Sequence, residues 1–215
     1  DQSKQAVWST LKVIKETAML VWLESIKDSL RDYQYESVRS MLLSYFRWTK
    51  GWFVRSWEWT GKTRCMRALT YSLTHWIYPI TPVVIVVPTL TIQRWIVKSF
   101  EELWLNITPV SWSKIEIDPN TSYVMHQKTF LMHYDKLNDW SRYYVQDECH
   151  HASQSIIDAI NLWKSWVFWF TASPLRWEFK EDGFKMLYWT MYETWKESLP
   201  VKVYWIRKER KYSLD

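Results

Sequence analysis

Glycine is the residue that this sequence has least of, relative to an ordinary protein. Only 3 of its 215 residues are glycine, whereas an average content of about 7% predicts roughly 15. Tryptophan, in contrast, occurs 18 times, so the tryptophan surplus resembles the glycine deficit. We therefore expect many tryptophans to stand where a foldable parent sequence has glycine. The alternative is a protein that is naturally rich in tryptophan.

The positions of three tryptophans support this expectation. Trp76, Trp104 and Trp163 each follow a segment with a helical pattern. The residue just after a helix often has a positive φ, which glycine adopts without a steric penalty. A bulky aromatic side chain is unfavourable there. The sequence therefore predicts a backbone with positive φ at these three helix ends.

Cysteine and long hydrophobic runs are scarce as well. Cys65 and Cys149 are too few for a disulfide framework and lie in no metal-ligand spacing, so we interpret both as reduced structural thiols. The longest strongly apolar run, at 83–87, is too short to cross a bilayer, and no basic-then-apolar leader opens the sequence. We expect a soluble intracellular protein, cytoplasmic or nuclear, with no membrane partner.

The remaining composition is that of an ordinary globular protein. Hydrophobic residues make up 47% and charged residues 24%, with no low-complexity tract and no internal repeat. The length favours one large domain. A net charge of +5 and a pI near 9.0 suit an anionic partner without requiring one.

Hydrophobic periodicity predicts the elements. Residues 4–30 have the apolar spacing of one or two amphipathic helices, which we expect to pack on the main domain or on a missing N-terminal one; a membrane-surface role is an alternative, although the face is not notably basic. Strands are expected at 52–55, 83–87, 122–125, 143–146, 166–170 and 201–206. Helices are expected at 62–75, 91–103, 129–137 and 154–162.

This alternation predicts an α/β fold. Strand and helix at this rhythm form a three-layer, doubly wound, mainly parallel sheet with helices on both faces. Ligands of such sheets bind at the carboxyl ends of the strands. The motifs below lie at those ends.

Gly61-Lys62-Thr63 stands between an expected strand and an expected helix. In a phosphate-binding loop, backbone N–H groups and the helix N-terminus hold the phosphates, the lysine neutralises β/γ oxygens and the threonine hydroxyl ligates Mg²⁺. The flanking Thr60 and Arg64 join the nucleotide-binding candidates. The sequence therefore predicts ATP and Mg²⁺ as cofactors.

The same loop departs from the expected pattern. The full motif has glycine at position 56, where Ser56 stands, and the variants that relax this position have glycine at 59, where Trp59 stands. Glycine allows the backbone to turn tightly and to approach the phosphates closely, which an indole would block. Taken literally, Trp59 predicts impaired ATP binding.

Two adjacent carboxylates, Asp147 and Glu148, end another expected strand. At the strand end next to a phosphate loop, Asp147 can hold Mg²⁺ through water while Glu148 polarises the attacking water. We expect Glu148, Lys62 and Asp147 to be the catalytic residues. The following His150 and His151 have no further ligands beside them in sequence, so we do not expect a metal site there.

These residues resemble a known family. Asp147-Glu148-Cys149-His150 is similar to the DEAD/DEAH-box signature of superfamily 2 helicases in its DECH form. The stretch 30–34 (LRDYQ) resembles the adenine-recognising motif of that family, which implies that Gln34, with Arg31, contacts the base.

Further stretches agree in order with the same family. The VVPT at 86–89 resembles the motif that grips the phosphate backbone of the strand, and 170–176 (FTASPLR) resembles motif III of the branch related to restriction-enzyme motor subunits and phage helicases. HQKT at 126–129 lies where the family has another strand-binding motif. The resemblance implies two sets of residues. Those coupling hydrolysis to movement are His150, Thr171 and Ser173; those contacting nucleic acid are Pro88, Thr89, Gln93, Gln127 and Arg176.

The resemblance covers about 30–206 and implies a domain plan. We expect an N-terminal helical extension at 1–28, a first RecA-like domain at 29–206, and the start of a linker to a missing second RecA-like domain at 207–215. In this family the second domain supplies arginines to the γ-phosphate. The resemblance therefore implies an ATP hydrolase that is weak or inactive as an isolated first domain.

The predicted function is an ATP-dependent nucleic-acid helicase or translocase, with DNA favoured over RNA as its partner. Three alternatives stay open. They are an RNA helicase or double-stranded-RNA-sensing ATPase, a nucleotide-dead nucleic-acid-binding module as Trp59 suggests, and a P-loop ATPase unrelated to strand movement.

Overall fold

The computed structural model describes residues 2–46, 51–56, 61–75, 81–111, 114–171 and 203–206 of the chain. The helices are α1 (Gln2–Ser25), η1 (Lys27–Ser29), α2 (Asp32–Phe46), α3 (Lys62–Thr74), α4 (Leu90–Glu101), α5 (Gln127–Leu137), η2 (Cys149–His151) and α6 (Gln154–Asn161). The strands are β1 (Gly51–Ser56), β2 (Val83–Val87), β3 (Thr108–Val110), β4 (Tyr123–His126), β5 (Tyr143–Gln146), β6 (Val167–Thr171) and β7 (Val203–Ile206).

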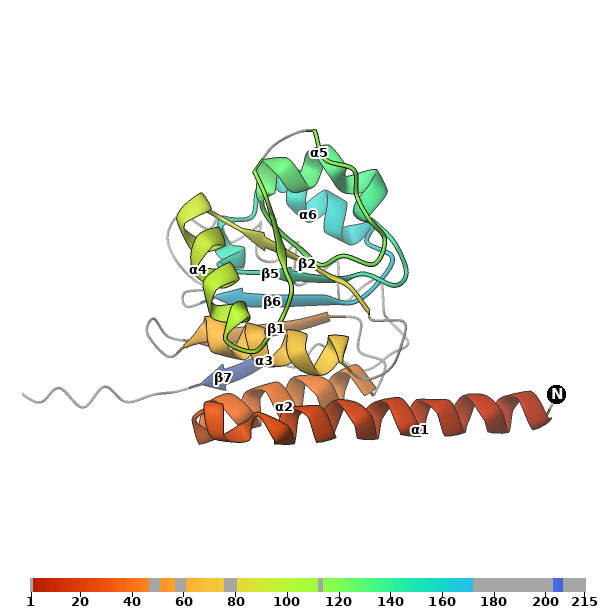
Figure 1. The fold of residues 1–215 in the computed structure, drawn as a ribbon. Coiled ribbons are helices and arrows are strands. Elements are labelled where there is room, and N and C mark those ends of the chain that lie inside the picture. Colours follow the sequence, from red (N-terminus) through yellow and green to blue (C-terminus); the bar gives the residue numbers. More distant parts are fainter. Residues whose placement is uncertain are drawn as a thin grey trace, which may run out of the picture.

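The strands form one seven-stranded sheet in the order β3-β4-β2-β5-β6-β1-β7. Every described pair of neighbours is parallel. Helices cover both faces, with α1 to α4 on one side and α5 and α6 on the other (Figure 1). The predicted doubly wound α/β fold is therefore confirmed.

Strand β2 shows how the sequence builds these layers. Val83, Ile85 and Val87 pack into the core with α1 to α4, while Val84 and Val86 pack into the core with α5 and α6. Side chains alternate between the two faces of a strand, so a strand covered on both sides is apolar throughout. For this reason the run at 83–87 predicts a strand with the observed bounds.

Besides the short η2, two elements were not predicted, α2 and β3. The buried positions of α2 include Gln34, Ser37, Val38, Met41 and Leu42, which have the spacing of one helix face. Two of these five residues are polar, so hydrophobicity alone does not show the stripe. Strand β3 has only 3 residues, too few for alternation to be recognised.

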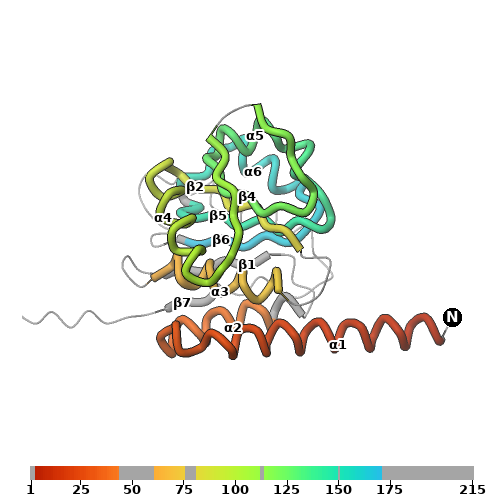
Figure 2. The backbone as a smooth tube through the Cα atoms, in the orientation of Figure 1, coloured from red at the N-terminus to blue at the C-terminus, as the bar shows by residue number. Residues whose placement is uncertain are grey.

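Helix α1 packs on the domain with its C-terminal half. Met19, Leu23 and Ile26, at and just beyond this end, are buried in the same core cluster as α2, α3 and α4. The N-terminal half projects beyond the rest of the fold (Figure 2), and there Val7 and Leu11 are exposed. No helix in the described part of the chain is long and apolar enough to cross a membrane.

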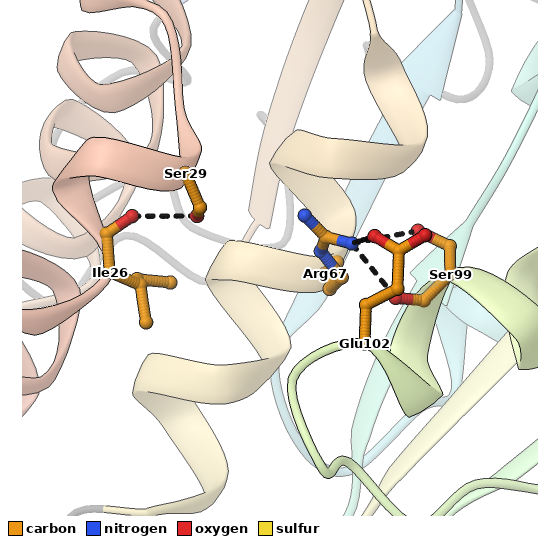
Figure 3. A network of polar contacts seen from close by, with 5 residues as sticks. All are labelled: Ile26, Ser29, Arg67, Ser99 and Glu102. Atoms are coloured by element: carbon orange, nitrogen blue, oxygen red, sulfur yellow. Dashed lines mark hydrogen bonds and ion pairs between the residues drawn. The ribbon is translucent and has the colours of Figure 1, made fainter.

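A buried arginine ties α3 to α4 (Figure 3). Arg67 is 4% exposed, and its guanidinium donates to the Ser99 carbonyl oxygen at 2.9 Å and pairs with the Glu102 carboxylate. On the other side of α3, the Ser29 hydroxyl donates to the Ile26 carbonyl oxygen at 2.7 Å and closes the η1 turn (Figure 3). The contacts of Arg67 fix α3, the helix that begins at Lys62, against α4.

Helix α4 ends as the tryptophan pattern predicts. Trp104 has a φ of +57°, and its N–H donates to Glu101 O at 3.0 Å while the Leu105 N–H donates to Phe100 O at 3.1 Å. This pair of bonds is a Schellman motif, whose left-handed residue is usually glycine. The prediction is thus confirmed at Trp104 and wrong at Trp163, which has no positive φ and is 1% exposed in the core. Trp76 lies outside the described residues.

Candidate functional site

The candidate residues gather at the carboxyl ends of three neighbouring strands. Strand β6 lies between β5 and β1. The chain leaves β1 toward Lys62 at the start of α3, and it leaves β5 toward Asp147 and Glu148. Thr171, the last residue of β6, is the register partner of Arg55 in β1. Strand order therefore places the end of β6 between the phosphate loop and the acidic pair.

Gly61 precedes the first turn of α3 in a backbone conformation that suits glycine. Its φ is +87° and its ψ is 42°, in the left-handed region. A β-carbon at this position would collide with the side-chain amide nitrogen of Gln34. The backbone conformation therefore favours glycine here, and a larger residue would also require the Gln34 side chain to shift.

Lys62 and Glu148 meet across the ends of the strands. Their side chains form an ion pair although the residues are 86 positions apart in sequence. The lysine is 12% and the glutamate 20% exposed, so both are mostly shielded yet accessible to a ligand. The fold thus brings together the lysine of the phosphate loop and the second carboxylate of the acidic pair.

Asp147 is held firmly at the end of β5. It is 5% exposed, its N–H donates to Val86 O at 3.0 Å, and its Oδ1 accepts from the Glu148 N–H at 3.0 Å. Burial raises the pKa of the Asp147 carboxyl, and the charge of Lys62 partly offsets that shift. A nearby cation would therefore stabilise the ionised form.

Glu148 has a strained backbone. Its φ of +47° and ψ of 55° are left-handed, a conformation that costs a residue with a side chain about 1–2 kcal/mol. Strained residues of this kind cluster at functional sites, where the surrounding structure holds them. Here the His151 N–H donates to Glu148 O at 2.9 Å and closes the turn of η2.

Gln34, which the resemblance assigns to the base, lies beside Gly61. It is 2% exposed, its Oε1 accepts from the Arg31 N–H at 3.0 Å, and its amide nitrogen faces Gly61. The Arg31 side chain is exposed. The structure therefore joins 30–34 to the GKT, which sequence order alone does not show.

The donor types at this site fit Mg²⁺. Thr63 is half-buried in the first turn of α3, and the Asp147 carboxylate ends β5; hydroxyl and carboxylate oxygens are the ligands that Mg²⁺ prefers. Arg64 is exposed. Within the described ranges no group of three or more His, Cys, Asp or Glu side chains could hold a metal ion.

The expected strand-binding residues follow β2. Thr89 is exposed and caps α4, with its hydroxyl accepting from the Ile92 N–H at 3.3 Å, and Pro88 is half-buried beside it. Gln93 is 3% exposed, and its amide donates to the Ser111 hydroxyl at 3.5 Å. Thr89 therefore faces solvent, whereas Gln93 lies inside the fold.

Gln127 is the first residue of α5 and is also buried, at 9% exposure. Its amide contacts the backbone at His151 and Ser153, immediately after the acidic pair. This connection could not be expected from sequence, because it depends on how α5 and η2 pack together.

Some predicted residues cannot be placed. Thr60, Ser173 and Arg176, together with Trp59, lie outside the described residues. For His150 and Thr171 the backbone is described but the side chain is not. Sequence reasoning missed Arg67, which anchors α3; its neighbours on the same helix face include Thr63, Thr70 and Thr74, so no hydrophobic pattern indicates that this face is buried.

The fold is similar to three solved structures. For the UvsW helicase from bacteriophage T4, identity is 14% and the TM-score 0.58, covering 80% of this chain and 59% of that one. For the Sulfolobus solfataricus SWI2/SNF2 ATPase core in complex with dsDNA, identity is 18% and the TM-score 0.57, covering 73% of this chain and 35% of that one. For a further structure of T4 UvsW, identity is 17% and the TM-score 0.54, covering 80% of this chain and 33% of that one. The chain thus spans less than two thirds of these proteins, and at such identities the likeness shows the fold.

No curated protein sequence matches the chain significantly. The sequence model of the type III restriction enzyme res subunit matches residues 27–176, which is more than half of the chain. That span contains Gln34, the GKT at 61–63 and the acidic pair. With the fold and the meeting of these motifs at one sheet edge, the match shows that the chain belongs to the ResIII family, that of the type III restriction enzyme res subunit, and forms a RecA-like domain of superfamily 2 helicases.

Proposed function

We propose that this domain binds Mg-ATP at the sheet edge and is the first motor domain of a DNA helicase or translocase. At the level of the family, the chain is a helicase-type motor domain. The observation that carries the finer proposal is the Lys62–Glu148 ion pair, because it joins the phosphate-loop lysine to the carboxylate expected to activate water.

Each residue has a distinct role in this proposal. The N-terminus of α3 and Lys62 bind the phosphates, and Thr63 and Asp147 would hold Mg²⁺. A bound Mg²⁺ would neutralise charge on the β/γ oxygens. Glu148 takes the proton of the attacking water as general base, and Gln34 recognises the adenine.

The ion pair also suggests how nucleotide binding prepares the site. Without nucleotide, Lys62 neutralises Glu148 and occupies it. Phosphate oxygens that attract Lys62 compete for the same charge, so binding releases the Glu148 carboxylate to accept a proton. The partial exposure of both side chains, 12% and 20%, is consistent with such an exchange.

DNA is the favoured partner for two reasons. The sequence has a net charge of +5, which favours a polyanion, and one structural neighbour is an ATPase core in complex with dsDNA. RNA remains the alternative substrate. The second RecA-like domain would supply an arginine that stabilises the transferring phosphate, an effect worth several orders of magnitude in related phosphoryl transfer.

The test uses the full-length protein, with ATP binding and hydrolysis measured with and without DNA or RNA. Lys62→Ala should abolish ATP binding, whereas Glu148→Gln should retain binding and lose hydrolysis. Lys136→Ala, an exposed lysine near the end of α5, is the matched control and should behave as the wild type. Hydrolysis that persists in Glu148→Gln would contradict the assignment of the general base.

Other outcomes select among the alternatives. Stronger stimulation by RNA than by DNA would favour an RNA helicase or RNA-sensing ATPase. Hydrolysis that no nucleic acid stimulates would indicate a P-loop ATPase unrelated to strand movement.

A second candidate function follows from Trp59. If the indole blocks the phosphates, the protein is a nucleotide-dead module that binds nucleic acid without hydrolysis. The sequence itself favours this candidate, since Trp59 stands where the loop needs bare backbone. Calorimetry that detects nucleic-acid binding and no ATP binding would establish it.

A further inference from the structure

The Gln127 side chain bridges the start of α5 and the segment that follows η2. It begins α5 directly after β4, in the stretch 126–129 where strand binding is expected. Its Nε2 donates to His151 O at 3.0 Å, and its Oε1 accepts from the Ser153 N–H at 3.4 Å. One side chain therefore contacts the chain on both sides of Ala152.

The bridged segment leads directly back to the candidate general base. The His151 N–H donates to Glu148 O at 2.9 Å, and the Ala152 N–H donates to Cys149 O at 3.0 Å. Between them these bonds close the η2 turn, whose first residue follows the left-handed Glu148. A shift of His151 must therefore alter the backbone that aims the Glu148 carboxylate.

The other end of the bridge lies close to the protein surface. His126 caps α5 by accepting the Lys128 N–H on its ring nitrogen at 3.2 Å, and Lys128 is exposed. The N-terminus of a helix with a lysine beside it suits a phosphate. Gln127 itself is 9% exposed, so it lies beneath this surface with its amide already bonded.

We propose that Gln127 is a positioning residue that couples strand binding at the start of α5 to the orientation of Glu148, and does not itself contact the strand. The inference rests on the proposed function. A side-chain amide can both donate to a carbonyl and accept from an N–H, and Gln127 does both on the two sides of Ala152. Movement of α5 on strand binding is thereby passed to η2 through two hydrogen bonds.

The test separates coupling from binding in the full-length protein. Gln127→Met keeps the length of the side chain and removes both hydrogen bonds. We expect the maximal DNA-stimulated kcat to fall about tenfold, within the range that mutations between coupled sites produce, while the Kd for DNA changes less than about twofold. Gln154→Met is the matched control, because the Gln154 amide bonds the exposed Asp158 at 2.8 Å, and it should retain full stimulation.

Gln127→Glu provides a second variant should the methionine variant fail to fold. It can still accept the Ser153 N–H but cannot donate to His151 O, so the same loss of maximal stimulation is expected. A weakened Kd for DNA with the maximal rate restored at saturation would overturn the inference, since Gln127 would then be a direct contact. A lowered melting temperature with unchanged stimulation would overturn it too.

The proposed function fails in a different way. Its failure is a wild-type protein whose ATP hydrolysis no nucleic acid stimulates, and that result removes the basis of this inference as well. If nucleic acid stimulates the wild type and both Gln127 variants equally, this inference is overturned while the proposed function stands.

Discussion

Trp104 stands in a backbone conformation that penalises its own side chain. Its φ is +57°, and its indole is 93% exposed, so almost no packing offsets the steric cost. Trp104→Gly should therefore stabilise the fold by about 1 kcal/mol. For a domain of this size we expect the Tm in thermal denaturation to rise by about 2–4 °C.

The same helix provides the control. Trp95 is also exposed, at 68%, but it lies inside α4, where glycine is less favourable than other residues by about 1 kcal/mol or less. Trp95→Gly should lower the Tm. A fall in Tm for both variants would show that the backbone at position 104 is not under strain.

Trp59 decides the chemistry at the neighbouring residues. Lys62 and Thr63 have the side chains that phosphates and Mg²⁺ need, but an indole three residues before the lysine would stand between them and the nucleotide. Trp59→Gly should raise the affinity for ATP by about tenfold or more, equivalent to about 1.4 kcal/mol. Isothermal calorimetry measures this directly, with Trp140→Gly, at a 77% exposed tryptophan, as control. Equal affinity in both variants would show that Trp59 does not obstruct the loop.

Residues that are proposed for their own functional groups could be singled out from sequence. Gly61, Lys62 and Asp147 belong to this group, because the proposed binding of phosphate and Mg²⁺ calls for those groups in that order. The left-handed backbone of Glu148 and the amide bridge of Gln127 could not be predicted. Both depend on the packing of η2 against segments distant in sequence.

At the scale of elements, α1 is held partly by a lysine that burial makes harder to charge. The Lys15 ammonium lies 3.5 Å from the Tyr143 hydroxyl at the start of β5, and desolvation lowers the pKa of Lys15 from 10.5 to about 8. At a pH between these two pKa values, Lys15 binds more protons in the unfolded chain than in the folded one. The contribution of Lys15 to stability therefore improves as the pH rises from about 8 to 10.5.

This shift predicts a pH-dependent difference between two proteins. The free energy of unfolding of the wild type, minus that of Lys15→Met, should rise across this window by no more than about 2 kcal/mol, since each pKa unit is worth about 1.4 kcal/mol and the group is partly solvated. Taking the difference from the variant removes the contribution of other groups that titrate at high pH to the free energy of unfolding. Urea denaturation at pH 8, 9 and 10 measures the difference, and Lys12→Met, whose side chain is 41% exposed, is the control. A constant difference would show that α1 does not bury Lys15.

Elements were predictable where one rule determines them. The strand at 83–87 is buried on both faces, so the run of apolar residues begins and ends where the strand does. In α2 the buried face includes Gln34 and Ser37, which a hydrophobic pattern does not count, and the Gln34 amide faces Gly61. The pattern therefore misses α2 because polar residues form part of its buried face.

At the scale of the whole molecule, alternation of strands and helices predicted the layers but not the order of the strands. The Lys62–Glu148 pair forms because β6 alone separates β1 from β5, and no local pattern specifies that neighbourhood. The resemblance to the family implied that the GKT and the acidic pair belong to one site, which hydrophobic periodicity could not indicate. Fold class is therefore set by local patterns here, whereas the site is set by topology.

The composition of the whole chain extends the evidence from Trp104. A chain with 3 glycines and 18 tryptophans contains a tryptophan at a left-handed helix end and another at position 59, where a phosphate loop has glycine. A codon difference can exchange these two residues at particular positions, because UGA is translated as tryptophan in some genetic codes and as glycine in others. We therefore expect glycine at 104 and 59 in the protein made by its natural host.

The measurement is the intact mass of protein isolated from that host, with peptide sequencing across 99–105 and 57–63. The mass should fall below that of the printed sequence by a whole multiple of the difference between tryptophan and glycine, and the gene should carry UGA at both positions. A mass equal to that of the printed sequence would identify a naturally tryptophan-rich protein. In that case the natural protein has the steric cost at Trp104, just after α4. The nucleotide-dead function would then be favoured over the motor function, because the natural protein would have the indole at position 59.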